Sequence, residues 1–156
     1  MMNFVEVSVE GVESPEWLDR LQHFCLAALK RMGKSGWEVS LLLCDDAFIR
    51  DLNRRFRDKD EPTDVLSFAQ DPSEVPGSAD DEDEIPFVAG DIAISLDSLA
   101  QNARDFSVGE EEELKRLVVH GLLHLSGMDH DTNEPEEEML LFQEQVLTDL
   151  AQERIF

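Results

Sequence analysis

Three of the four histidines in this chain fall within eleven residues, between His120 and His130. His120 and His124 are four positions apart, so on a helix their imidazoles project from one face, one turn apart. Such a pair can hold one ion at Zn–N distances of about 2.0–2.1 Å. Gly127 favours a left-handed helix end, after which the chain can bring back His130. We therefore predict a metal site of His120, His124 and His130 with one open position, which is typical of a catalytic zinc ion.

The position after the first histidine argues against a peptidase. The spacing follows the H-E-x-x-H pattern of zinc hydrolases, and the whole run follows the longer metzincin pattern, in which the third histidine comes after a glycine. Here the residue after His120 is Gly121, so the glutamate that acts as general base in a metalloprotease is missing. Asp129, next to a predicted ligand, would either orient an imidazole or cap a turn.

Length and charge restrict the class of protein. The chain has 156 residues, which suits a single domain over residues 1–156. It has no apolar run of roughly 20 residues and no signal-like start, so we expect a cytoplasmic protein that does not bind membranes. With 13 basic against 36 acidic residues, the net charge is −23. This balance argues against binding nucleic acid by phosphate contacts alone. For Cys25 and Cys44 we expect buried thiols, with a disulfide as the lesser alternative.

Hydrophobic periodicity predicts a small α+β domain, with helices packed on a mixed sheet. Expected strands cover residues 3–9, 37–44, 65–68 and 87–95. The first expected helix begins with a Ser14-Pro15 cap and runs to Met32, and the second begins with an Asp45 or Asp46 cap and ends before Pro62. A third is expected over residues 96–106. The fourth begins with a Ser107–Glu110 capping box and contains the histidines, and the last runs from Asn133-Glu-Pro135 to the end. In the second helix, Phe48, Ile49, Leu52 and Phe56 are expected inward and the arginines outward. Residues 71–84 suggest an acidic solvated loop, with a calcium site as the poorer alternative.

The basic residues are not spread evenly. Five of the 13 lie within ten positions, as Arg50, Arg54, Arg55, Arg57 and Lys59. They are followed by the run Asp60-Glu-Pro62-Thr-Asp-Val-Leu-Ser-Phe68. Because a proline disfavours helical backbone at the residue before it, the second helix must end before Pro62. The histidine run and this second run are the two chemically distinctive segments of the chain.

These two segments resemble those of the bacterial YbeY-type rRNA maturation factors, a family of zinc-dependent endoribonucleases. The family pattern H-G-x-x-H-L-x-G-x-D-H matches His120 to His130 throughout, including the glycine. The pattern R-x-x-D-x-P-T-D-V-L-S-F matches from Arg57 to Phe68, and Gly90-Asp91-Ile92 is similar to the G-D-I strand of the family. The acidic stretch near residues 71–84 and the very negative net charge depart from the family pattern.

The resemblance implies a compact domain with a mixed four-stranded sheet flanked by helices and a metzincin-like site of three histidines holding one zinc ion. It implies cleavage of single-stranded rRNA in small-subunit (16S) 3′-end maturation and in ribosome quality control. The catalytic residues would be Arg57, His120, His124 and His130. Arginine can grip two phosphate oxygens at once, so Arg57 would clamp phosphate, with a structural salt bridge as the alternative. Partners would be the small ribosomal subunit and its proteins, and a ribosome-associated GTPase as a further candidate.

Two other interpretations of the function remain open. The acidic charge suits a non-catalytic assembly factor that binds basic ribosomal proteins or a GTPase and uses the metal for its fold. A metal-dependent hydrolase of another ester or amide is a third interpretation.

The aromatic composition bears on how RNA would be recognised. The chain has no tyrosine and no RNP-like aromatic run, so base stacking is not expected to carry RNA recognition. Arg54 or Arg55 would touch the RNA backbone.

Overall fold

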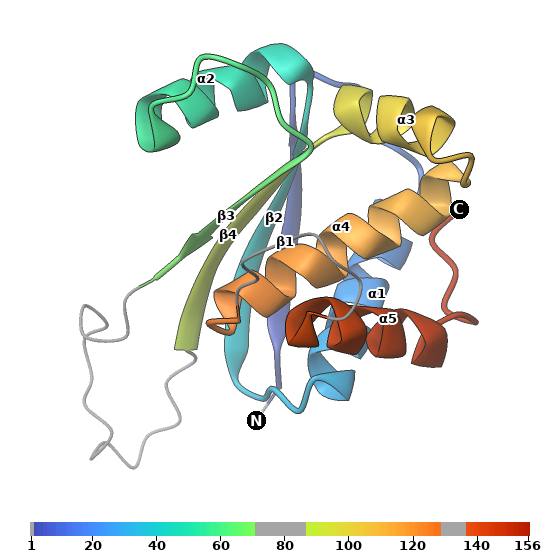
Figure 1. Ribbon diagram of the computed structural model, residues 1–156. Helices are drawn as coiled ribbons and strands as arrows, with labels where there is room; N and C mark the ends of the chain where they lie inside the picture. The colour runs from blue at the N-terminus through green and yellow to red at the C-terminus, as the bar shows by residue number, and fades with distance from the viewer. Residues whose placement is uncertain (1, 71–86, 129–136) are drawn as a thin grey trace.

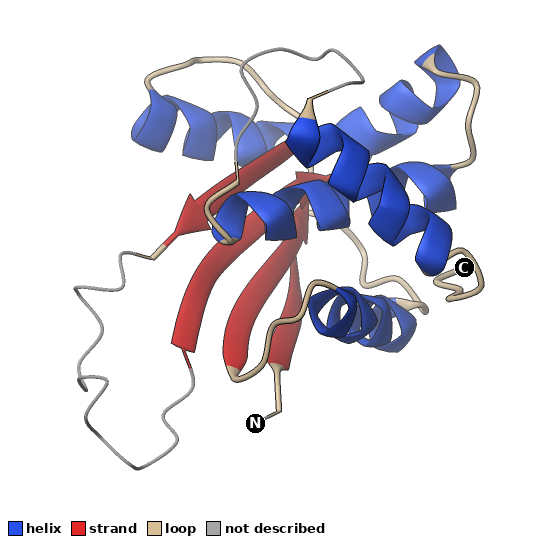
Figure 2. Cartoon of the chain, turned by 60° about the horizontal axis from the view of Figure 1, so that its bottom comes forward, coloured by secondary structure: helices blue, strands red, loops and turns tan. Residues whose placement is uncertain are grey.

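The computed structural model describes residues 2–70, 87–128 and 137–156, and its elements follow the predicted order (Figures 1 and 2). They are β1 (Phe4–Glu10), α1 (Leu18–Arg31), β2 (Trp37–Cys44), α2 (Asp46–Arg57), β3 (Val65–Ala69), β4 (Phe87–Ser95), α3 (Leu96–Asp105), α4 (Glu110–Leu125) and α5 (Glu138–Asp149). The strands form one sheet in the order β1-β2-β4-β3. The first two pairings are parallel and the β3–β4 pairing is antiparallel, which confirms the α+β fold with a mixed sheet.

The antiparallel strand β3 lies at an edge of the sheet and depends on a glycine in its neighbour. Gly90 has a φ of +141°, and a Cβ there would collide with the carbonyl oxygen of Phe68. The β2–β4 register shifts just before this point, between Glu38 and Val39, as it does at a β-bulge. Gly90 therefore lets β3 approach β4 closely. The outer edge of β3, away from β4, stays available to line a site.

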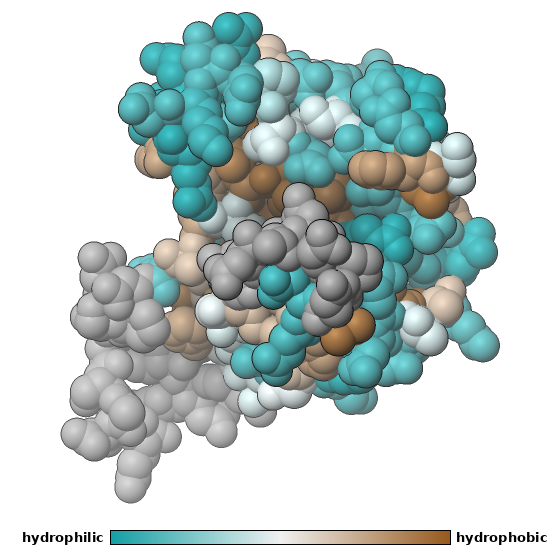
Figure 3. Space-filling view, in the orientation of Figure 1, coloured by the Kyte–Doolittle hydropathy of each residue, from teal (hydrophilic) through white to brown (hydrophobic). Residues whose placement is uncertain are grey.

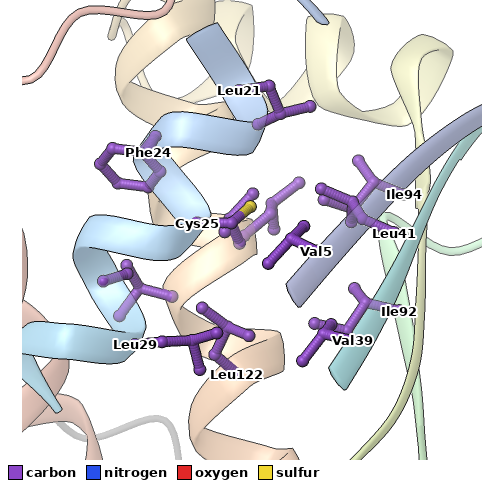
Figure 4. Packing of buried hydrophobic residues seen from close by; sticks show 14 of the residues in the cluster. Val5, Leu21, Phe24, Cys25, Leu29, Val39, Leu41, Ile92, Ile94 and Leu122 are labelled. Carbon is purple, nitrogen blue, oxygen red and sulfur yellow. The ribbon is translucent and has the colours of Figure 1, made fainter. Parts of the chain in front are cut away.

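One face of the sheet carries the main hydrophobic core. Side chains from β2 and β4, such as Val39, Leu41 and Ile92, pack against Leu29 of α1 and Leu122 of α4 (Figure 4). These side chains are almost completely buried because α4 crosses the sheet with apolar residues around most of its circumference. The helix that carries the histidines is thus fixed against the sheet along its length.

The opposite face is covered by α2 through a smaller cluster that includes Ile49 and Leu66. Asp45 caps this helix by accepting a hydrogen bond from the N–H of Phe48 at 2.9 Å, as predicted. The prediction for Phe56 was wrong, because its side chain is 60% exposed. The reason is its position: Phe56 lies in the last turn of α2, where its ring contacts Phe68 of the edge strand β3 and the guanidinium of Arg55 rather than the core.

Two predicted helix caps were also wrong. The first helix begins at Leu18, after Ser14, and Trp17 in the preceding turn packs against Phe156 with the ring centroids 5.0 Å apart. Helix α4 is capped by Gly109 rather than by Ser107, which has a φ of +56° and instead ends the preceding helix. The predicted start of the last helix at Asn133 and the acidic stretch 71–84 lie outside the described residues.

Two further predictions concern cysteines and membranes. Cys25 and Cys44 are free and buried, which confirms the expected thiols. Burial raises the pKa of each thiol to about 12, so neither supplies a thiolate nucleophile at neutral pH. Among the described residues, no helix combines the length and the apolar character that spanning a bilayer requires.

Candidate metal and phosphate site

Helix α4 places two of the predicted ligands one turn apart near its C-terminal end. His120 and His124 are half-buried, and their rings stand edge to face with centroids 4.6 Å apart. The helix ends as predicted at Gly127, whose φ is +94° and whose N–H donates to the carbonyl of His124. Because a helix C-terminus carries a partial negative charge, this position favours a bound cation.

The outer nitrogen of each imidazole is held by a partner. Nδ1 of His120 lies 2.7 Å from Oε1 of Gln143 on α5, and Nδ1 of His124 lies 3.1 Å from the carbonyl oxygen of Met128. A carbonyl oxygen only accepts, so the Nδ1 of His124 must donate its proton there. These contacts direct both Nε2 atoms to one place, where they are 3.0 Å apart.

The donor set fits a metal ion. When Nδ1 of a neutral imidazole carries the proton, Nε2 presents a lone pair, which is the ligand form that zinc requires. Metal-binding histidines almost always donate their second nitrogen to a carbonyl or carboxylate, as His124 does. Two Nε2 atoms directed to one point, each with its ring fixed from behind, are the expected arrangement for two ligands of one ion.

Gly121, where metalloproteases carry glutamate, faces the sheet. A Cβ at this position would lie 3.0 Å from side-chain atoms of Ile92, which is itself only 1% exposed. Glycine is therefore needed for α4 to approach β4 this closely. The missing glutamate has a packing cause, since a longer side chain here would point into the core.

Arg57 lies across from the histidines, at the end of α2. Its Nη2 atom donates to the carbonyl oxygen of Ser67 at 2.6 Å, and its guanidinium carbon lies 5.4 Å from the ring centroid of Phe68. The other α2 arginines pair with acids, as Arg50 does with Asp60. Among the described residues, no carboxylate lies within ion-pair distance of Arg57, so the salt-bridge interpretation finds no partner there.

Edge strand β3 forms the floor between the two sides. The carbonyl of Asp64 accepts a hydrogen bond from the N–H of Ser95, and the N–H of Gln70 donates one to the carbonyl of Ala89. The main-chain groups of the even-numbered residues of β3 are therefore the ones that bond to β4. Main-chain groups alternate along an antiparallel strand, and those of Ser67 therefore face away from the sheet. Its carbonyl takes the Arg57 hydrogen bond, and its N–H remains directed to the same side.

These groups share one open cleft of about 430 Å³. It is lined by Arg57, Val65, Leu66, Ser67, Ala69, His120 and His124. The space-filling view shows a hollow with apolar walls below the hydrophilic surface over α2 (Figure 3). The structure thus brings together Arg57, His120 and His124 of the four predicted catalytic residues. His130 and Asp129 lie outside the described residues, and among those that are described no third His, Cys, Asp or Glu completes a metal-holding group.

Sequence reasoning missed Gln143. It is a buried polar residue, only 5% exposed, within the apolar stripe that Met139, Val146 and Leu150 form on α5. A polar side chain in such a stripe needs a hydrogen-bonding partner, and this was the signal that could have found it. The partner itself, His120, is 23 positions away and could not be read from the sequence.

The sequence and the fold are similar to those of known proteins. The sequence model of the family described as Endoribonuclease YbeY matches residues 5–151. A protein named Endoribonuclease YbeY from Treponema denticola is 50% identical, with 94% of this chain and 93% of that protein covered. Another with this name from Borreliella burgdorferi is 40% identical, with 85% and 86% covered. The solution structure of TM1509 from Thermotoga maritima matches with a TM-score of 0.60 and 26% identity, with 96% and 91% covered.

Proposed function

Because this chain belongs to the Endoribonuclease YbeY family, we propose that it is a zinc-dependent endoribonuclease that cuts single-stranded RNA. We further propose that it acts in the cytoplasm, in 3′-end maturation of 16S rRNA and in ribosome quality control. The observation that carries the proposal is the cleft in which Arg57 faces the converging Nε2 atoms of His120 and His124. A bound cation next to a permanently charged side chain can stabilise the negative charge of a phosphodiester while it is cut.

The chain's own residues divide the work. His120 and His124, with His130 as the proposed third ligand, would hold the zinc ion, and Gln143 and the Met128 carbonyl keep the first two rings in the ligand orientation. Zinc would supply a Lewis acid for a phosphoryl oxygen and a water of lowered pKa. Among the described residues, His120 and His124 are the proposed ligands.

Arg57 would bind the phosphate. Its hydrogen bond to Ser67 and its contact with Phe68 hold the guanidinium at the edge of the cleft without neutralising it. A guanidinium can bind two phosphate oxygens and stabilise the charge that gathers on them during cleavage. The outward N–H of Ser67 would offer a further neutral donor to the same group.

The alternative is an assembly factor that does not cut. The net charge of −23 favours partners that are basic, such as proteins of the small ribosomal subunit, and a GTPase bound to the ribosome is a further candidate. These partners are compatible with cleavage, since they would bring the RNA to a surface that is otherwise acidic.

Cleavage of RNA separates the two functions. The zinc-loaded protein should cut a 16S rRNA 3′-end fragment that is single-stranded and leave the same sequence in a duplex intact. His124→Ala, in the wall of the cleft and outside the main core, should abolish cutting and keep the circular dichroism of the fold. A zinc-loaded protein that binds the fragment but never cuts it, alone or on the small subunit, would favour the assembly factor.

A further inference from the structure

An exposed aromatic ring lies next to the phosphate-binding arginine. Phe56 is 60% exposed in the last turn of α2, immediately before Arg57. Its ring meets that of Phe68 edge to face, with centroids 5.4 Å apart and an interplanar angle of 64°. Single exposed phenylalanines are common on protein surfaces, but Phe56 is distinguished by its place between Phe68 and the arginine that lines the cleft.

The Phe56–Phe68 pair does not line the cleft but adjoins it through Arg57, which does. The guanidinium of Arg57 lies 5.4 Å from the Phe68 centroid while its Nη2 contacts Ser67 in the cleft floor. Phe68 is thus in contact with both Phe56 and Arg57. A nucleotide whose phosphate binds Arg57 would have its own base, or the next one, within reach of the pair.

Charge around the pair suits RNA. The guanidinium of Arg55 lies 5.6 Å from the Phe56 centroid, and Arg54 is exposed on the same turn. Both arginines also pair with Asp51, in ion pairs that are largely in solvent and that phosphate groups can compete for. This is the one basic stretch of a chain whose net charge is −23. Single-stranded nucleic acids bind where positive side chains follow the backbone and aromatic faces accept the bases.

We propose that Phe56, supported from below by Phe68, is a stacking platform for an unpaired nucleobase next to the phosphate that is cut. The inference rests on the proposed function and adds a substrate-positioning residue to it. Stacking uses the face of the base, which any base can offer, so the platform selects unpaired nucleotides without selecting a sequence. It differs from the sequence-based expectation that base stacking does not carry RNA recognition.

The platform also gives single-strand selectivity a physical cause. In a duplex, both faces of a base are stacked on its neighbours, and extruding one costs a few kcal/mol. A base in a single strand can turn onto Phe56 without this cost. Duplex RNA would then bind its phosphate at Arg57 without placing the bond for cleavage.

Phe56→Leu tests the platform, with Phe106→Leu as the matched control. Leucine keeps an apolar side chain but removes the ring, and Phe106 is another exposed phenylalanine, 67% exposed, at the end of α3. Phe56→Leu should raise KM for a single-stranded oligonucleotide about 5- to 150-fold, because stacking one base contributes about 1–3 kcal/mol. Phe56→Trp should keep a KM near that of the wild type, and Phe106→Leu should change nothing.

Abasic substrates make the test specific. The cleavage site of the wild-type protein is mapped first, and single abasic nucleotides are then placed on either side of it. One abasic position should weaken the wild-type protein as much as Phe56→Leu does, and the two changes together should cost no more than either alone. Equal KM for wild type and Phe56→Leu, or losses that simply add, would overturn the platform while cleavage itself stands. A wild-type protein that cuts no RNA would overturn the proposed function, and the platform with it.

Discussion

The two sides of the cleft are built in opposite ways. The α4 side is packed against the sheet along the helix, and its two imidazoles are fixed from behind by Gln143 and the Met128 carbonyl. The α2 side is exposed: Arg57 leans on the carbonyl of Ser67, and Phe56 stands in water. The contrast suits the two proposed tasks, because the ligands of a metal ion must be fixed and a surface that binds a flexible single strand must be able to adapt.

Packing and polarity follow the same division. On the α4 side no space remains beside Gly121, whose added Cβ would meet Ile92 at 3.0 Å. On the α2 side, three arginines form ion pairs with acids, and both partners of each pair are largely in solvent. Substitutions should therefore affect stability and metal binding on the first side, and substrate binding and rate on the second.

Gly121→Glu should have the largest effect. It restores the glutamate of metalloproteases but forces a carboxylate against Ile92 in the core. Overpacking and an unpaired buried charge together should lower the free energy of unfolding by about 3 kcal/mol or more. Urea denaturation measures this. Gly109→Glu is the control, because its Cβ meets nothing within 4 Å, and equal stability of the two variants would contradict the close packing of α4.

Arg57→Lys should come next. Lysine keeps the charge but cannot bind two oxygens in one plane, so kcat/KM for single-stranded RNA should fall about 10²-fold, and for Arg57→Ala about 10³-fold. Bound zinc and unfolding free energy should not change, since Arg57 is exposed. Full activity in the lysine variant would rule out a bidentate clamp.

Gln143→Leu should have a smaller effect, confined to the α4 side. It removes the side chain that contacts Nδ1 of His120 at 2.7 Å. The affinity for zinc should fall about 10- to 100-fold, because partners of metal-bound histidines carry contributions of this size. Competition with a chromophoric chelator measures it. Gln145→Leu is the control on the exposed side of the same helix, and equal zinc affinity in both variants would show that Gln143 does not orient the ring.

The smallest effects should be pH-dependent changes in stability, of opposite sign on the two sides. Burial raises the pKa of Glu113 on α4 above its ordinary 4.5, so its ionisation destabilises the fold as pH rises through that higher pKa. Glu113→Gln should therefore gain about 1 kcal/mol or less at pH 7 and nothing below pH 4.5.

Asp60, beside α2, should behave in the opposite way. A hydrogen bond from Arg50 lowers the pKa of Asp60 below 3.8, so the ionised carboxylate stabilises the fold above that pH and the benefit is lost in acid. Asp60→Asn should therefore lose stability at pH 7, slightly because the pair is exposed, and lose nothing in strong acid. Thermal unfolding of both variants between pH 3 and pH 7 would show whether the two signs differ.

The sequence was most informative where local rules decide the structure. The four-residue spacing of His120 and His124, and the glycine at position 127, predicted the histidine helix and its end correctly. The same periodicity was wrong for Phe56, because it assumes that a helix is covered along its whole length. The last turn of α2 leaves Phe56 exposed, and this depends on tertiary structure.

Contacts between elements that are distant in the sequence could not be predicted from it. The bond from Arg57 to Ser67 follows from the turn between α2 and β3, and the contact between Gln143 and His120 joins α5 to α4. The motif around Arg57 predicted that the residue matters, but its place opposite the histidines required the fold. The packing reason for Gly121 likewise required knowing that this position faces Ile92.

The most direct test of the account is a zinc titration that follows activity and fold in one sample. Metal is removed with a chelator, and zinc is added back in steps while RNA cleavage, bound zinc and circular dichroism are recorded. We expect cleavage to rise from none to its maximum at one equivalent of zinc while the circular dichroism stays constant, and His124→Ala to gain neither zinc nor activity. Cleavage without zinc, or an unfolded chain that zinc merely refolds without cleavage, would contradict the catalytic metal site.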